Sequence, residues 1–173
     1  MSFFLSLALL AASITSVNAQ TWTDCNPLNT TCPPDPALGT YHSWNFNETL
    51  DDKIWNLTNG GIGYTYDGAE FTIAERLQSP TLRSTFYIFF GIVESHVKMA
   101  AGAGIVSSVV LQSDDLDEID WEWVGSNTSS VQTNYYGKGI LDYHNGGMHN
   151  VENAASEFHN YTTYWDQNKL EWW

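Results

Sequence analysis

The segment Asp117-Glu118-Ile119-Asp120-Trp121-Glu122-Trp123-Val124-Gly125 indicates both the fold class and the chemistry of this chain. Three carboxylates recur in it at a period of two, with large apolar residues between them. Side chains alternate between the two faces of a β-strand, so one face would carry the acids and the other the tryptophans. Like charges on one face of a sheet repel each other, which destabilises the sheet. The pattern therefore predicts a strand whose acids serve chemistry, with Trp121 and Trp123 facing a core.

Short strand patterns continue on both sides of this segment. Residues 63–73 predict a hairpin that turns at Asp67-Gly68. Further strands are predicted over residues 86–99 with a possible bulge at Gly91, and over 105–112, 116–124, 131–136 and 158–165. A loop rich in Gly, Asn and His is predicted at residues 143–150, and no repeat or amphipathic helix interrupts the series. Many short strands separated by turn residues predict an all-β fold, an antiparallel β-sandwich or jelly roll with a concave substrate cleft.

The sequence divides into three parts. Residues 1–19 contain no charged side chain and end in a small-residue pattern, which favours a secretory signal peptide over a buried N-terminal core segment. Residues 20–39 form an irregular lead-in that contains both cysteines, Cys25 and Cys32. In an oxidising compartment so close a pair is expected to form a disulfide. Residues 40–173 would hold the catalytic domain, which we expect to be incomplete because its last residues, 169–173, read as the opening of a further strand.

Charge and composition limit the partners. The formal net charge of −14 disfavours nucleic acid and anionic membranes. Eight Trp and nine Tyr residues suit stacking on sugar rings as well as filling a core. Candidate glycosylation sites that support export are the five Asn-x-Ser/Thr asparagines, Asn29, Asn47, Asn56, Asn127 and Asn160. We expect a monomer with no transmembrane helix, no cofactor and no metal, since the spacing of the histidines and cysteines does not suggest a zinc site.

The acidic strand has the residues needed for glycosidic chemistry. Glu118 and Glu122 are four residues apart, so their Cα atoms would lie roughly 13 Å apart along a strand. If both side chains lean inward on a curved sheet, the carboxyl groups could approach to about 5–5.5 Å, the separation found in retaining glycosidases. Asp120 lies between them, and such crowding should raise at least one pKa. The alternatives are a solvated acidic edge strand and a calcium loop, although Ile119 occupies a position where an EF-hand needs a ligand.

These residues resemble glycoside hydrolase family 16, whose signature is E-[I/L]-D-x-E on a strand of a concave sheet. The similarity extends to the fungal Crh-like cell-wall transglycosylases and covers nearly all of residues 25–173. The segments that carry it are Cys25-Asn26-Pro27, residues 31–39 (TCPPDPALG), residues 104–114 (GIVSSVVLQSD) and residues 132–139 (QTNYYGKG).

The resemblance implies a role for each acid. Glu118 matches the nucleophile, Glu122 the general acid and base, and Asp120 the helper that tunes the nucleophile. It also implies a secreted retaining transglycosylase of the fungal cell wall that cleaves chitin and transfers it to chitin or β-glucan. A β-glucan hydrolase and a non-catalytic polysaccharide-binding wall protein stay open as alternatives. Further candidates for sugar binding are Gln132, Asn134, Tyr135, Tyr136, Lys138 and Glu94, with one of the two tyrosines expected to face the cleft.

Overall fold

The computed structural model describes residues 25–173, so the predicted signal peptide over residues 1–19 lies outside the described residues. The elements are β1 Trp55–Thr58, β2 Ile62–Thr65, β3 Gly68–Phe71, β4 Thr81–Ser84, β5 Gly91–Val97, β6 Val106–Gln112, β7 Glu118–Val124, β8 Ser130–Tyr136, the short 3₁₀ helix η1 Tyr143–Asn145, β9 Gly147–Asn150, β10 His159–Trp165 and β11 Leu170–Trp172. Within the described part every strand of a sheet pairs with its neighbours in antiparallel orientation.

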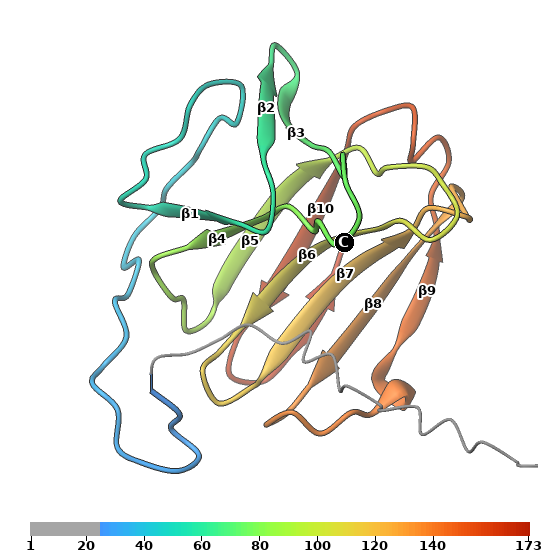
Figure 1. Cartoon of the computed structure of the whole chain (residues 1–173). Coiled ribbons are helices and arrows are strands. Elements are labelled where there is room, and N and C mark those ends of the chain that lie inside the picture. The colour runs from blue at the N-terminus through green and yellow to red at the C-terminus, as the bar shows by residue number, and fades with distance from the viewer. Residues whose placement is uncertain (1–24) are drawn as a thin grey trace, which may run out of the picture.

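Two sheets form the two layers of a sandwich. One has the strand order β6-β7-β8-β9 and the other β11-β10-β5. Figure 1 shows the four strands of the first sheet side by side, with β5 and β10 behind them. Two smaller sheets, β1-β4 and β2-β3, lie at one end of the sandwich. The prediction of an all-β antiparallel sandwich is confirmed.

The core lies where β7 faces β10. Trp121 and Trp123 are 4% and 0% exposed, and the ring of Tyr161 packs edge-on against both, with centroids 5.2 and 4.6 Å away. The indole N–H of Trp121 donates a hydrogen bond to Thr163 Oγ1 at 3.0 Å across the two layers. The expectation that both tryptophans face the core is confirmed. Since they point toward β10, the alternating acids of β7 must point away from it.

The lead-in segment contains a disulfide loop and, after it, pairs with the chain just before β5. Cys25 and Cys32 form the predicted disulfide. Ala37 pairs with Tyr87 in a parallel bridge just before β5. The segment after the disulfide is therefore fixed to the chain between β4 and β5.

Two of the predicted strands begin two or more residues later than the sequence pattern predicts. The strand expected over residues 86–99 starts only at Gly91, because Phe90 and Gly91 have φ angles of 70° and 143° and so interrupt the extended backbone. The strand expected from residue 116 starts at Glu118, because Leu116 has a φ of 67°. Both errors have one cause, since left-handed backbone at a bulky residue is not visible in hydrophobic alternation.

The predicted loop and the predicted hairpin turn were also partly wrong. Residues 143–150 contain η1 and the short strand β9, which pairs with β8. The hairpin β2-β3 has its two turn residues at Tyr66 and Asp67, with Gly68 already in β3. Among the described residues no helix is long and apolar enough to cross a membrane.

Candidate active site

The three acids of β7 point to the open face of the four-stranded sheet. Antiparallel register places Glu118 beside Gln112 of β6 and Tyr136 of β8, and Glu122 beside Gln132 of β8. Paired residues share a face, so side chains of three neighbouring strands surround the acids.

Asp120 is the most enclosed of the acids. It is 3% exposed, and its Oδ1 is buried without a hydrogen-bond partner. Burial, followed by the charge of Glu118, a hydrogen bond with Glu118 and the charge of Glu122, raises its pKa to about 8. Asp120 therefore holds a proton at neutral pH and can donate it in the hydrogen bond to Glu118.

Glu122 is half-buried and lines a cavity of about 340 Å³. Burial and then the charge of Glu118 raise its pKa. A carboxyl group that tends to keep its proton and that faces a cavity has the properties of a general acid.

Glu118 is oriented from the neighbouring strand. The Gln112 Nε2 donates a hydrogen bond to Glu118 Oε2 at 2.6 Å. One oxygen of the carboxylate is therefore fixed by a neutral amide, and the hydrogen bond with Asp120 adds a second constraint. Such constraints hold the carboxylate in one orientation, and a fixed orientation lowers the entropic cost of attack for any group that serves as a nucleophile.

Three of the predicted sugar-binding residues lie on the acid face. Gln132, Asn134 and Tyr136 all line the cavity that holds Glu122. Within it Asn134 Nδ2 donates a hydrogen bond to the Tyr136 hydroxyl at 2.7 Å. The expectation that these three share a face with one another is confirmed, and their role in binding sugar stays a prediction.

The other three predicted sugar-binding residues lie elsewhere. Tyr135 pairs with Ile119, so it faces the opposite side of the sheet, where its ring stacks on Trp172 with centroids 6.4 Å apart. Glu94 is on β5 in the other sheet, where Asn160 Nδ2 donates to its Oε1 at 3.5 Å. Placing these two residues in the cleft was therefore wrong.

Lys138 is exposed and outside the set of residues that line the cavity. Its contact with the site is made by its backbone, since its N–H donates a hydrogen bond to Asp117 Oδ1 at 2.9 Å.

Sequence reasoning missed Gln112, Tyr143 and Met148. Gln112 could have been found, because a short turn between two strands places the last residue of one beside the first of the next. Tyr143 and Met148 also line the cavity beside Glu122. They lie in the region predicted to be a loop, where no alternation of hydrophobic residues marks their positions.

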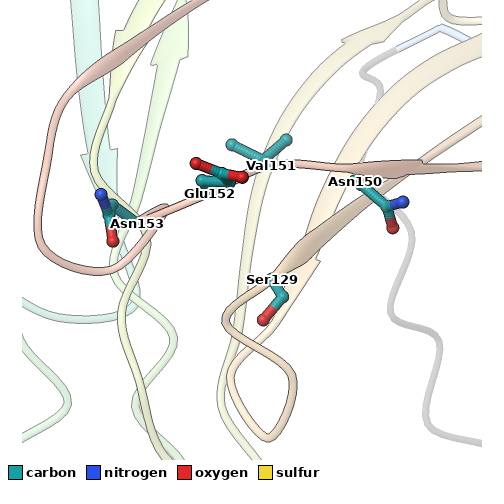
Figure 2. Close-up of a pocket in the computed structure, with 5 residues that line it drawn as sticks. All are labelled: Ser129, Asn150, Val151, Glu152 and Asn153. Carbon is teal, nitrogen blue, oxygen red and sulfur yellow. The ribbon is translucent and has the colours of Figure 1, made fainter.

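A second hollow of the surface lies away from the acids. It has a volume of about 450 Å³ and is lined by Ser129 and residues 150–153. Figure 2 shows these five side chains, with Glu152 the only carboxylate among them. A hollow with a single carboxylate lacks the pair that glycosidic chemistry needs.

Among residues 25–173 no group of three or more His, Cys, Asp or Glu side chains could hold a metal ion.

The candidate glycosylation sites differ in their surroundings. Asn29 and Asn127 are exposed in turns, and Asn160 is exposed on β10. Asn47 and Asn56 are half-buried, the latter within β1 opposite Arg83.

Comparisons with known proteins agree with this geometry. Crh-like protein 3 of Aspergillus fumigatus is 68% identical over 100% of this chain, which covers 48% of that relative. Two solved structures of Crh5 transglycosylase, apo and in complex with NAG, have 43% identity and a TM-score of 0.80, over 86% of this chain and 62% and 61% of theirs. The β-glucanase of Bacillus licheniformis has 25% identity and a TM-score of 0.65, over 75% of this chain and 71% of its own.

The chain spans less than half the length of the first curated relatives that it matches, 48%, 39% and 47%. The model of the family described as glycosyl hydrolases family 16 matches residues 49–173, which include all three acids of β7. This chain belongs to glycosyl hydrolases family 16.

Proposed function

We propose that this chain carries the catalytic acids of a retaining transglycosylase that cleaves chitin and transfers it to chitin or β-glucan in the fungal cell wall. The observation that carries the proposal is the position of Asp120, buried between Glu118 and Glu122 on one face of β7. The similarity to a Crh5 transglycosylase in complex with NAG supports the sugar class, because NAG is the repeating unit of chitin.

In the first step Glu118 attacks the anomeric carbon of the donor sugar. The bond between that carbon and the glycosidic oxygen breaks, and Glu122 gives its proton to the departing oxygen. The raised pKa of Glu122 suits this role, because the group must be protonated before the reaction. Asp120 donates its hydrogen bond to Glu118, which orients the attacking carboxylate.

In the second step a hydroxyl group of the acceptor sugar attacks the same carbon. Glu122, now ionised, takes the proton of that hydroxyl, and the bond to Glu118 breaks. The cavity beside Glu122 is where an acceptor would bind, and it offers the amide groups of Gln132 and Asn134 together with the ring of Tyr136. These groups can hydrogen-bond and stack on a sugar, as the alternation pattern predicted.

The export of the protein is part of the proposal. The uncharged N-terminal leader and the disulfide between Cys25 and Cys32 support secretion, because disulfides persist in oxidising compartments. The sequence similarity to fungal Crh-like proteins supports a fungal cell-wall location. Finding free thiols at both cysteines in secreted protein would contradict this part.

A β-glucan hydrolase is the second candidate, and the structural similarity to the β-glucanase of Bacillus licheniformis favours it. The two activities share the first step and differ in whether water or a sugar resolves the intermediate. A wall protein that binds polysaccharide without turnover is the third. Three repelling carboxylates give such a binder no advantage.

The test uses a chitin oligomer as donor and a fluorescent chitin or glucan oligomer as acceptor. We expect the parent chain to form labelled polymer and Glu118→Gln to form none, whereas Glu70→Gln, an exposed change on β3, keeps the parent rate. Equal product from the parent and Glu118→Gln would refute the role of Glu118. Free sugar without labelled polymer would favour the hydrolase, and retention of chitin without either product would favour the binding protein.

A further inference from the structure

Tyr87 joins three segments that are far apart in the sequence. Its backbone N–H donates to the Pro36 carbonyl at 2.7 Å, and its own carbonyl accepts from the Leu38 N–H at 3.0 Å. Its phenolic hydroxyl donates to Asp114 Oδ1 at 2.7 Å. Asp114 lies in the turn between β6 and β7, so Tyr87 connects the segment after the disulfide to that turn.

The turn between β6 and β7 sets the position of the nucleophile. It connects Gln112, the hydrogen-bond donor, directly to Glu118, the acceptor. The turn is closed by the Ser113 N–H, which donates to the Asp117 carbonyl at 2.9 Å, and by the Leu116 N–H, which donates to the Ser113 carbonyl at 3.1 Å. A displacement of this turn would therefore change the 2.6 Å contact between Gln112 and Glu118.

The turn is held from two sides. The loop after β8 holds one side, because the Gly139 N–H donates to the Leu116 carbonyl at 2.8 Å and the Lys138 N–H to Asp117 Oδ1 at 2.9 Å. Tyr87 holds the other side through the side chain of Asp114. Hydrogen bonds to a charged acceptor are among the strong ones in proteins, so this contact can restrain the turn.

We propose that Tyr87 is a positioning residue for Glu118: its hydroxyl holds Asp114, and the turn that contains Asp114 keeps Gln112 against the nucleophile. The lead-in segment that bears the disulfide thereby supports the active site through the backbone of Tyr87. Only the kinetic test of this inference requires the proposed function to be correct.

Tyr87 is suited to this part because it keeps its proton. Burial, and then the hydrogen bond to Asp114, raise its pKa to about 12. The hydroxyl therefore stays a donor over the pH range in which the acids of β7 change their charge.

The kinetic test compares Tyr87→Phe with Tyr66→Phe, a change at a residue that is 93% exposed. At saturating chitin oligomer we expect Tyr87→Phe to lower kcat about tenfold, within the hundredfold that a displacement of about 1 Å can cost. KM should stay within about twofold, because no group that touches the sugar is removed. Tyr66→Phe should match the parent.

Variants of Asp114 separate positioning from a general loss of structure. In Asp114→Asn the amide oxygen still accepts from Tyr87, so we expect kcat to stay within about threefold of the parent, whereas Asp114→Ala should resemble Tyr87→Phe. The double variant of Tyr87→Phe and Asp114→Ala should be no slower than Asp114→Ala alone, because Asp114→Ala already removes the acceptor of the Tyr87 hydroxyl. Additive losses, or equal losses in Asp114→Asn and Asp114→Ala, would overturn the proposal.

A second readout does not depend on turnover. Asp120 can be followed by ¹³C NMR of labelled carboxyl groups, because the charge of Glu118 and its hydrogen bond help to raise the Asp120 pKa to about 8. If Tyr87→Phe lets Glu118 move away, we expect this midpoint to fall by about 0.5 or more. An unchanged midpoint in folded Tyr87→Phe would overturn the proposal, even if the parent transferred no sugar and the proposed function had failed.

Discussion

The proton on Asp120 gives the fold a pH dependence that one substitution should remove. Asp120 has a pKa of about 8 in the folded chain, against an ordinary value of 3.8. Between these two pH values the folded state binds a proton that the unfolded state has lost. Stability from this group is therefore fully present below about pH 4, falls as the pH rises, and is lost through pH 8.

The size of the effect follows from one proton. A difference of one bound proton changes the free energy of unfolding by about 1.4 kcal/mol per pH unit. Between pH 5 and pH 7, Asp120 should therefore cost the parent roughly 3 kcal/mol of stability. In Asp120→Asn the side chain is neutral at both pH values, and its amide can still donate to Glu118. The raised pKa of Glu122 also makes the free energy of unfolding fall as the pH rises. It does so in both proteins, so the contribution of Glu122 largely cancels when they are compared.

Urea unfolding at pH 5 and pH 7, followed by the fluorescence of the core tryptophans, measures this difference. We expect the parent to lose roughly 3 kcal/mol more than Asp120→Asn between the two pH values. Asp67→Asn, at an exposed position in the turn of the β2-β3 hairpin, should follow the parent. Equal pH slopes for the parent and Asp120→Asn would show that Asp120 is ionised throughout this range and would refute the reasoning.

Three further changes test other parts of the site and of the fold. Glu122→Gln removes the proton donor, so the rate of transfer from a chitin oligomer should fall about 10²-fold or more; a fall of less than tenfold would exclude Glu122 as the general acid. Gln112→Leu removes the 2.6 Å hydrogen bond to Glu118, and kcat at saturating donor should drop about tenfold, whereas an unchanged kcat would mean that the bond does not orient the nucleophile. Replacing Cys25 and Cys32 by serine opens a loop with a sequence separation of 7, which should lower the free energy of unfolding by about 2.5 kcal/mol in urea titrations. If reducing the disulfide of the parent leaves its free energy of unfolding unchanged, this expectation is wrong.

The catalytic strand could be predicted from sequence because its two faces differ so strongly in chemistry. Alternation of acids with Trp121 and Trp123 fixes which side chains face the core, and the burial of both tryptophans follows from it. The same alternation carries over to β8, where Gln132, Asn134 and Tyr136 share a face. A strand with one apolar face and one polar face therefore reveals its orientation without any knowledge of its partners.

Features that depend on a single backbone angle or on a distant partner could not be predicted. The start of β5 is set by the left-handed backbone at Phe90, although phenylalanine is a residue type that is common in strands. Glu94 was wrongly predicted to line the cleft, because a strand pattern does not show to which sheet the strand belongs. The cavity residues Tyr143 and Met148 come from a region without periodicity. The pairing of β9 with β8 places Met148 beside Gln132, and Tyr143 lies in η1, just before β9.

The repulsion that makes the acidic strand unusual is also what prepares it for chemistry. Carboxyl groups that are crowded and partly buried cannot all ionise at neutral pH, so protons stay where burial is greatest. Asp120, at 3% exposure, keeps its proton and becomes a donor to Glu118, while the charge of Glu118 in turn favours the proton on Glu122. The charge of Glu118 contributes to the raised pKa of both neighbours, which suits the roles proposed for Glu118 as nucleophile and for Glu122 as acid. The spacing of two residues is essential to this outcome, because an acid moved by one position would face the tryptophan core instead.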